Sequence, residues 1–272
     1  MRKIEFTKLV ASGNDFIIIN YGIWMNKYGL RKLAKKICDR RYGIGADGLL
    51  VLEKSKIADI KMRIFNPDGS EAEMCGNGAR CTALYVKSQI PNSKSQINLE
   101  TKAQIVEAEV NKDNVRIKLT APRDLKLDIP IKINNRLLKV NFIHTGVPHT
   151  VIFVEGLDKI DVVNLGRTIR YHKRFQPQGT NVDFVEVLSD DSIKIRTYER
   201  GVEDETLSCG TGAVSSALVT ESHLKYPGFK RINVYTKSDE VLKVYFRRIN
   251  NEFEDVWLEG KVRIVYKGVG YV

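Results

Sequence analysis

The chain of 272 residues repeats itself at about half its length, and this repeat limits the folds that it can adopt. The segment "CGNGARCTAL", residues 75–84, matches "CGTGAVSSAL", residues 209–218, at Cys, Gly, Gly, Ala, Ala and Leu. Upstream of each segment lies an acidic loop, in which Glu71 aligns with Glu205. The order of strand, strand, acidic loop, Cys-Gly-x-Gly and helix thus occurs twice. It predicts a pseudo-symmetric α+β fold of two β-rich lobes, each wrapped around a central helix.

Short runs of alternating apolar and polar residues dominate the chain and indicate strands. Among them are "FIIIN", "GLLVLE", "IKMRIFN", "INLETKAQIVEAEV", "VDFVEVL" and "SIKIRTYE". Helical patterns are few. One covers "LRKLAKKICDRRYG", with Gly43 as its expected stop, and the other two begin directly after Cys75 and Cys209.

The two halves of the repeat set the expected domain boundaries. We expect a first lobe of residues 1–119, to which residues 262–272 cross back, and a second lobe of residues 120–261, with the active-site cleft between them. Gly13 of "SGNDFIII" aligns with Gly146 of "TGVPHTVI", which extends the repeat further upstream.

Composition and charge exclude several classes of partner. The chain is 43% hydrophobic and 28% charged, which is typical of globular proteins, and it lacks the roughly 18-residue apolar run of a membrane span. The N-terminus has no apolar signal-peptide core, so a cytoplasmic location is expected. The net charge of +11 comes from scattered Lys and Arg without a recognition motif, so no nucleic-acid partner is expected.

Two of the four cysteines have an ordinary explanation. Cys38 and Cys81 lie on apolar sides of expected helices, where a small thiol packs in the core. The close pair Cys75 and Cys81 has neither C-x-x-C spacing nor a nearby histidine, so no metal is expected. The stretch "GIGADG", residues 43–48, has a helix before it and a strand after it, the reverse of a dinucleotide site.

Cys75 and Cys209 stand where a thiol can react. At the start of a helix the free N–H groups favour negative charge, which predicts a thiol pKa lowered from ~8.5 toward neutrality. The flanking glycines let successive amides face one anion, such as a carboxylate. The alternative is a pair of buried structural cysteines that the duplication copied, but two such motifs in register, each beside an acidic loop, favour function.

Two such sulfurs, one on either side of an α-carbon, can invert the configuration of that carbon. A thiolate removes the α-proton from one face, and a thiol returns a proton to the other face. Amide donors to the carboxylate would stabilise the charge that develops during proton removal. This chemistry needs no cofactor, neither a metal ion nor pyridoxal.

The motifs resemble those of the diaminopimelate epimerase family over the whole chain. "SGNDF", "GIGADG", "FNPDGSEAEMCGNGARC", "GTNVDF" and "YERGVEDETLSCGTGA" occur in the family's order. The resemblance implies interconversion of LL- and meso-2,6-diaminopimelate, a step toward lysine and peptidoglycan. It also implies that Cys75 and Cys209 are the two acid/base residues.

The resemblance further assigns substrate contacts. Donors to the reacting carboxylate are expected from Gly76, Asn77, Gly210 and Thr211. The rest of the substrate, including its distal amino and carboxylate groups, is expected to contact Asn14, Asn66, Asn181, Glu199 and Arg200. The family implies that His149 and Glu199 influence the protonation of the second cysteine. Read without the resemblance, the three asparagines could shape turns, Glu199 and Arg200 could form a surface ion pair, and His149 could be a loop histidine.

Two positions depart from many relatives, and they leave alternatives open. Val147 stands where an Asn often contacts the distal end, and Gly48 stands where some members have Gln. Rival functions are a racemase of proline or hydroxyproline, whose family commonly has His in place of Asn77, and a racemase of another amino acid. A non-enzymatic binder is the rival from another class. The expected partner is a small-molecule amino acid; a homodimer is compatible with the sequence but not decided by it.

Overall fold

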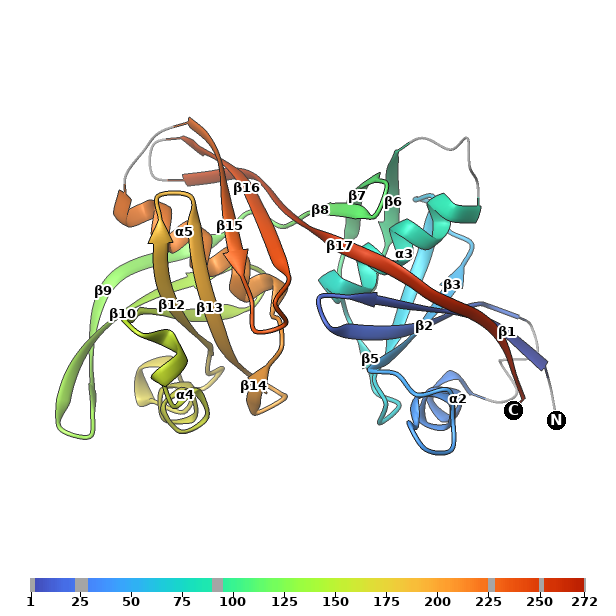
Figure 1. Ribbon diagram of the computed structural model, residues 1–272, viewed down its shortest axis with the longest axis horizontal. Coiled ribbons are helices and arrows are strands. Elements are labelled where there is room, and N and C mark those ends of the chain that lie inside the picture. Colours follow the sequence, from blue (N-terminus) through green and yellow to red (C-terminus); the bar gives the residue numbers. More distant parts are fainter. Residues whose placement is uncertain (1–2, 23–28, 90–94, 225–227, 250–251, 272) are drawn as a thin grey trace. The chain divides into compact units, whose positions relative to one another are not determined.

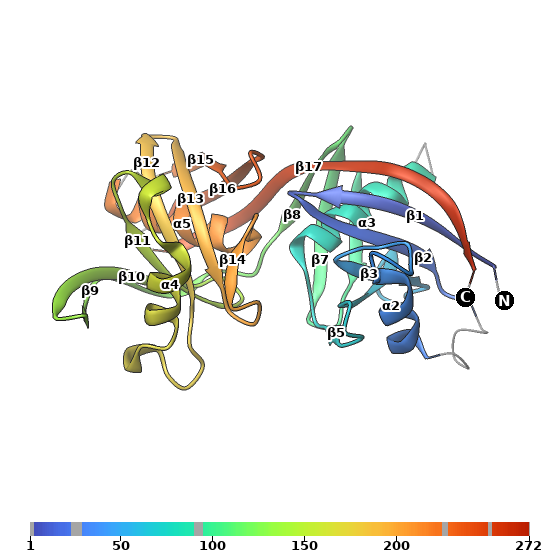
Figure 2. The same ribbon diagram turned by 60° about the horizontal axis from the view of Figure 1, so that its bottom comes forward.

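The computed structural model describes residues 3–22, 29–89, 95–224, 228–249 and 252–271. The chain divides into two compact units: unit 1 is Met1–Ile117 with Gly260–Val272, and unit 2 is Lys118–Glu259. Each unit is a curved sheet with one helix inside it and another outside it (Figure 1; Figure 2). None of the helices in these described ranges is long and apolar enough to cross a membrane.

Unit 1 begins with an antiparallel pair of strands and ends with a hairpin. Its elements are β1 (Lys3–Ala11), β2 (Asn14–Asn20), α2 (Leu30–Cys38), β3 (Gly48–Glu53), β4 (Ile60–Phe65), β5 (Glu71–Ala72), α3 (Gly76–Gln89), β6 (Gln96–Glu100), β7 (Ile105–Asn111) and β8 (Asn114–Lys118). Strands β2 and β3 are parallel, and the chain between them forms α2.

Unit 2 repeats this order. Its elements are β9 (Arg123–Ile133), β10 (Arg136–His144), β11 (Pro148–Phe153), α4 (Val162–Arg170), β12 (Asn181–Ser189), β13 (Ser192–Glu199), β14 (Asp204–Thr206), α5 (Gly210–Leu224), β15 (Gly228–Tyr235), β16 (Val241–Ile249) and the first part of β17 (Glu252–Tyr271), with short 3-10 turns at Leu157–Lys159 and Lys173–Phe175. Strands β11 and β12 are parallel, with α4 between them.

The helices that follow the two cysteines are the inner ones. In α3 the side chains of Ala79, Cys81 and Ala83 are fully buried, and in α5 Ala213 and Ala217 are fully buried. Small side chains allow the surrounding strands to approach these helices closely. The expected α+β fold with a central helix in each half is confirmed, and Cys81 is a core residue as expected.

Equivalent side chains make equivalent contacts in the two units. The Arg63 guanidinium donates to both Glu71 carboxylate oxygens at 2.7 and 3.0 Å, and Arg196 does the same with Glu205 at 2.7 and 2.9 Å. These pairs tie β4 to β5 and β13 to β14, the short strands that precede the cysteines. The predicted register of the repeat is therefore confirmed by side-chain geometry.

The turn that opens each parallel pair is also repeated. Gly13, between β1 and β2, has φ +77°, and Gly146, between β10 and β11, has φ +98°. Residues with a Cβ rarely adopt this conformation, so glycine is favoured at both turns.

Strand β17 is shared by the two units. Its first part pairs with β16, and its later part pairs with β1 from Ala11↔Val262 to Lys3↔Tyr271. The C-terminal strand thus returns to the N-terminal strand within unit 1. Val272, the last residue of the expected strand, lies outside the described residues.

Several details differ from the sequence expectations. Helix α2 ends at Cys38 rather than near Gly43, because Asp39 leaves the helical conformation and its carboxylate accepts from the amides of Arg41 and Tyr42. The run "INLETKAQIVEAEV" forms two strands, β6 and β7, rather than one. Helix α4 was not expected at all, and neither was the long β9–β10 hairpin.

Candidate active site

Both cysteines lie at the N-terminal ends of the inner helices, as the sequence predicts. The carbonyl of Cys75 accepts from the amide of Ala79 at 2.8 Å, and the carbonyl of Cys209 accepts from the amide of Ala213 at 2.9 Å. These are the first helical hydrogen bonds of α3 and α5, so each cysteine occupies the N-cap position. The amides of the first turn have no intrahelical partner, and the amide of Gly212 donates to the sulfur of Cys209.

The glycines after Cys209 are required by close packing. A Cβ on Gly212 would lie 2.5 Å from Oδ1 of Asp183 and 3.2 Å from Oγ1 of Thr197. In unit 1, a Cβ on the equivalent Gly78 would lie 3.1 Å from a methyl group of Leu50. Glycine at these positions therefore lets each helix start approach the neighbouring strand.

The protonation of Cys209 differs from the sequence expectation. Burial raises the pKa of the Cys209 thiol well above its ordinary value, and the charges of Glu199 and Asp183 raise it further. Hydrogen bonds from Thr211 and from the Gly212 amide act in the opposite direction but do not offset burial. The predicted lowering toward neutrality is not found for this cysteine, because its surroundings in unit 2 favour the protonated thiol.

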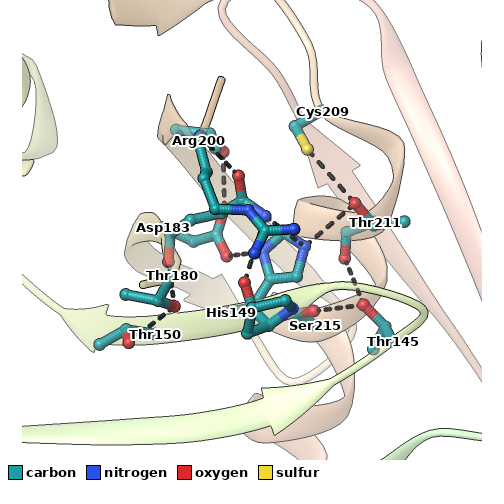
Figure 3. A network of polar contacts seen from close by, with 12 residues as sticks. Thr145, His149, Thr150, Thr180, Asp183, Arg200, Cys209, Thr211 and Ser215 are labelled. Atoms are coloured by element: carbon teal, nitrogen blue, oxygen red, sulfur yellow. Dashed lines mark hydrogen bonds and ion pairs between the residues drawn. The ribbon is translucent and has the colours of Figure 1, made fainter. Parts of the chain in front are cut away.

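His149 lies on a strand and links Asp183 to the start of α5. It belongs to β11, and its side chain is fully buried. Nδ1 lies 2.7 Å from Oδ2 of Asp183, and Nε2 lies 3.0 Å from Oγ1 of Thr211. The Thr211 hydroxyl in turn lies 3.5 Å from Sγ of Cys209 (Figure 3). The alternative of a loop histidine is therefore wrong in its placement, because His149 lies on a strand with partners for both ring nitrogens.

Thr145 holds the first turn of α5 in place. Its hydroxyl lies 2.8 Å from Oγ of the fully buried Ser215, and it donates to the carbonyl of Thr211 at 3.3 Å. The backbone at Thr211 is thus anchored to the end of β10, independently of the Thr211 side chain (Figure 3).

Asn181 and Arg200 are joined within unit 2. The Asn181 side chain accepts from the Arg200 amide at 2.7 Å and donates to the Pro148 carbonyl at 3.1 Å. The guanidinium of Arg200 donates to the Gln178 carbonyl at 3.0 Å. Asn181 therefore braces the segment that carries Arg200.

Glu199 is half-buried, and burial raises the pKa of its carboxyl group. No ion pair joins Glu199 to Arg200 among the described residues. The alternative of a surface ion pair is therefore not supported.

Unit 1 holds its predicted residues in separate places. Asn14, the first residue of β2, donates to Oδ2 of Asp47 at 2.9 Å, and Arg40 binds Asp47 and Asp15 at 2.7 Å each. Hydrogen bonds from Arg40 and Lys8 outweigh burial and hold the pKa of Asp15 well below its usual range. The amide of Asn14 is thus oriented by a network of charges.

Asn66 and Asn77 also have partners within unit 1. Asn66 is exposed in the turn between β4 and β5 and donates to Oγ of Ser70 at 2.9 Å. Asn77 is buried in the first turn of α3, where its Oδ1 accepts from the buried Arg80 at 2.6 Å. Turn formation explains the local role of Asn66, whereas Asn77 binds a buried cation beside Cys75.

The two atypical positions have different surroundings. A Cβ on Gly48 would lie 3.1 Å from the ring of Phe16, so a larger residue at Gly48 would require Phe16 to move. Val147 is half-buried in the β10–β11 turn, where its carbonyl accepts from the Thr145 amide at 3.1 Å.

Unit 2 therefore brings Cys209, Thr211, His149, Asn181 and Arg200 into one network (Figure 3). Sequence reasoning missed Asp183, although it lies in the quoted motif "GTNVDF". A signal was available: Asp183 lies between Val182 and Phe184 in an expected strand, and a buried charge requires a partner. Asp47, which lies in "GIGADG", was missed in the same way.

The geometry agrees with comparisons to known proteins. The family model described as "Diaminopimelate epimerase" matches residues 6–123 and 141–264. The diaminopimelate epimerase of Aquifex aeolicus is 41% identical over 284 residues, which cover 97% of each chain. The chain belongs to the diaminopimelate epimerase family. A family member from Caldanaerobacter subterraneus is 41% identical over 97% of this chain and 98% of its own.

Solved structures of other families have a fold similar to that of this diaminopimelate epimerase family member. The PhzF-family phenazine biosynthesis protein of Bacillus anthracis has a TM-score of 0.77 at 18% identity and covers both chains fully. A hydroxyproline epimerase of Agrobacterium vitis has a TM-score of 0.72 at 17% identity and covers 99% of this chain and 91% of its own. At these identities the likeness concerns the fold alone.

Proposed function

We propose that the protein is an isomerase that interconverts LL- and meso-2,6-diaminopimelate, a reaction in the synthesis of lysine and peptidoglycan precursors. The observation that carries the proposal is the paired placement of Cys75 and Cys209, each at the N-cap of an inner helix in a duplicated fold. Relatives that are 41% identical over 97% of the chain carry the name diaminopimelate epimerase.

In the proposed mechanism, one cysteine acts as a thiolate and the other as a thiol. The thiolate takes the α-proton, and the thiol protonates the opposite face of the resulting carbanion, so the roles exchange in the reverse direction. Cys209, which burial keeps protonated in the ligand-free state, begins as the acid. Because the two sulfurs change roles, their titration belongs to the pair rather than to either residue. No cofactor takes part in this mechanism.

The substrate contacts follow from the helix starts and the polar groups near them. Amides at Gly76, Asn77, Gly210 and Thr211 would receive the reacting carboxylate. Such preorganised donors typically contribute about 2.7–4 kcal/mol each to the stabilisation of developing charge. Asn14, Asn66, Asn181, Glu199 and Arg200 are proposed to hold the remainder of the substrate, with Arg200 suited to a carboxylate. His149 and Glu199 are proposed to influence the protonation of Cys209.

The direct test is conversion of LL-diaminopimelate by freshly reduced protein. We expect the meso isomer to appear until the two isomers reach equilibrium, measured by chromatography that separates them. Proline and hydroxyproline are incubated in parallel and should remain unchanged. Failure to form the meso isomer would contradict the proposal, and racemisation of proline instead would support the rival function.

Oxidation should inactivate the enzyme reversibly. If Cys75 and Cys209 approach one α-carbon, they are close enough to form a disulfide, which removes both the acid and the base. We expect loss of turnover with a mild oxidant, a Cys75–Cys209 linked peptide by mass spectrometry, and recovery with a reductant. Full activity in the oxidised protein would show that the sulfurs do not act on one centre. This requirement for reduced thiols also supports a cytoplasmic location.

A homodimer is part of the same proposal. The later part of β17 exposes several apolar side chains, namely Val265, Tyr266, Val269 and Tyr271. Exposed apolar side chains that gather on one segment are typical of interaction surfaces. Sedimentation equilibrium should give twice the chain mass of 30.9 kDa, and a monomer at all concentrations would contradict this assignment.

A further inference from the structure

Behind Cys209, a hydrogen-bonded series of three side chains ends at a buried carboxylate. Sγ of Cys209 lies 3.5 Å from Oγ1 of Thr211, which lies 3.0 Å from Nε2 of His149. Nδ1 of His149 lies 2.7 Å from Oδ2 of Asp183, and Oδ1 of Asp183 accepts from Oγ1 of Thr197 at 2.8 Å (Figure 3). His149 and Asp183 are both fully buried.

The surrounding bonds fix the direction of each hydrogen bond. The Arg200 amide donates to Oδ1 of Asn181, so the Asn181 nitrogen is the atom that faces Nε2 of His149, at 3.4 Å. An amide nitrogen only donates, so Nε2 carries a lone pair and the ring proton is on Nδ1, facing Asp183. The Thr211 hydroxyl therefore donates to Nε2, and its oxygen can accept from the Cys209 thiol.

The fold does not require these polar groups. The parallel pair β11–β12 of unit 2 is equivalent to the parallel pair β2–β3 of unit 1. His149 pairs with Asn181 as Phe16 pairs with Gly48, so His149 is equivalent to Phe16. Two residues further along, Asp183 is equivalent to Leu50. The glycine in the first turn of the helix approaches Leu50 in unit 1 and Asp183 in unit 2, which confirms the equivalence. The same core position is thus apolar behind Cys75 and polar behind Cys209. Because unit 1 has Phe and Leu where unit 2 has the buried His149 and Asp183, these two polar residues call for a functional explanation.

We propose that Thr211 relays the proton of Cys209 to Nε2 of His149, and that Asp183 is a positioning residue that fixes the tautomer of His149. The Cys209 proton moves to Oγ1 of Thr211 while the Thr211 proton moves to Nε2. The products are a Cys209 thiolate and a His149 imidazolium, whose charge the Asp183 carboxylate stabilises. No electrons are exchanged. This inference rests on the proposed function, because it explains how a buried thiol becomes the base in one direction of that reaction.

Other charged groups also face these residues. The Glu199 carboxylate on β13 interacts electrostatically with both Cys209 and His149. His144, at the end of β10, interacts electrostatically with His149 and with Arg200. These groups are unchanged in the variants below, so differences between the variants report on Thr211 and Asp183.

The first test removes only the hydroxyl. In a Cys75→Ala background, the thiolate absorbance of Cys209 is titrated against pH, with the Cys75→Ala/Cys209→Ala protein as the blank. We expect Thr211→Val to raise the titration midpoint by about one pH unit, whereas Thr211→Ser, which keeps the hydroxyl, restores it. In the protein that retains both cysteines, Thr211→Val should lower kcat about 10²-fold or more with little change in KM.

The second test changes the tautomer. In Asp183→Asn, Thr197 still donates to the side-chain oxygen, so the amide nitrogen faces Nδ1 and forces the ring proton to Nε2. We expect the same loss of kcat, with little change in KM, as for Thr211→Val. The thiol midpoint is compared only between the Thr211 variants, because loss of the Asp183 charge by itself lowers the pKa of Cys209. The control is Thr150→Val, which removes another fully buried hydroxyl of unit 2. The Thr150 hydroxyl donates to Thr180 at 3.0 Å and is not hydrogen-bonded to Thr211, His149 or Asp183.

The outcomes separate the relay from the proposed function. If Thr211→Val titrates like the wild type, or if Thr150→Val shifts the midpoint equally, the relay is wrong whatever the activity. If the midpoint shifts as expected while the wild type does not interconvert LL- and meso-diaminopimelate, the relay stands and the proposed function fails.

Discussion

Replacing Cys209 by alanine is expected to lower LL-to-meso turnover by about 10⁴-fold or more, and Cys75→Ala is expected to do the same. A positioned acid or base typically contributes about 10²–10⁴-fold, and each cysteine is required in both directions of a two-base reaction. Both side chains lie at helix N-caps, where an alanine fits without steric conflict, so both variants should fold. Turnover is measured with freshly reduced protein by separation of the two isomers.

Cys81→Ala provides the matched control. Cys81 is fully buried in α3, two turns or less from Cys75, and its loss should leave kcat within about twofold of the wild type while lowering stability by about 1 kcal/mol. Retained turnover in either Cys75→Ala or Cys209→Ala would exclude the two-base mechanism. Equal loss in Cys81→Ala would show that the effect is structural.

Among the variants described here, Glu205→Ala should lower the free energy of unfolding most, by about 3 kcal/mol. The Glu205 side chain is only 6% exposed, and it binds Arg196 through two hydrogen bonds and Lys237 at 2.7 Å. Removal of one partner leaves the partly buried Arg196 charge without its counterion, which typically costs about 3–5 kcal/mol in buried sites. Urea unfolding monitored by circular dichroism measures the change.

Glu109→Ala is the control for this effect. Glu109 binds Arg116 on the surface of unit 1, where both side chains are 35% exposed, and its loss should cost at most about 1 kcal/mol. A similar cost for the two variants would contradict the account of Glu205.

The contribution of Glu205 should also depend on pH. Burial raises the pKa of Glu205, but hydrogen bonds from Arg196 and Lys237 outweigh it, so the folded-state pKa lies below its usual range. A carboxyl group with a lowered pKa stabilises the fold above its unfolded pKa of about 4.3, and this stabilisation is lost as the pH falls toward the folded-state value. The stability difference between wild type and Glu205→Ala should therefore shrink below about pH 4.

Those parts of the fold that depend on local pattern could be predicted from the sequence. The Cys-Gly-x-Gly segments predicted the starts of α3 and α5. The alignment of Glu71 with Glu205 predicted equivalent positions, and in the structure both residues form equivalent ion pairs. Helix α4 was missed because Gly166 interrupts its pattern. That glycine is there because a Cβ would lie 2.5 Å from Cβ of Tyr198, a residue more than 30 positions away. The repeat was the available signal, since α4 occupies the place of α2.

The properties of the site depended on contacts that are distant in the sequence. The helix-start argument considered only the residues around Cys209, whereas its pKa is set by burial and by carboxylates on β12 and β13. The sequence predicts Thr211 as a donor to substrate, but it gives no sign that the Thr211 hydroxyl lies between Cys209 and His149. Strand pairing brings these groups together, and local sequence pattern does not specify it.

Incubation of LL-diaminopimelate in D2O tests the two-base mechanism most directly. Early in the reaction, the meso product should carry one deuterium at the inverted α-carbon, because the protonating thiol has exchanged with solvent. The remaining LL substrate should carry almost none, because the thiolate returns the original proton to the face from which it came. Deuterium appearing equally in substrate and product from the start would indicate a single base and would contradict the assignment of opposing roles to Cys75 and Cys209.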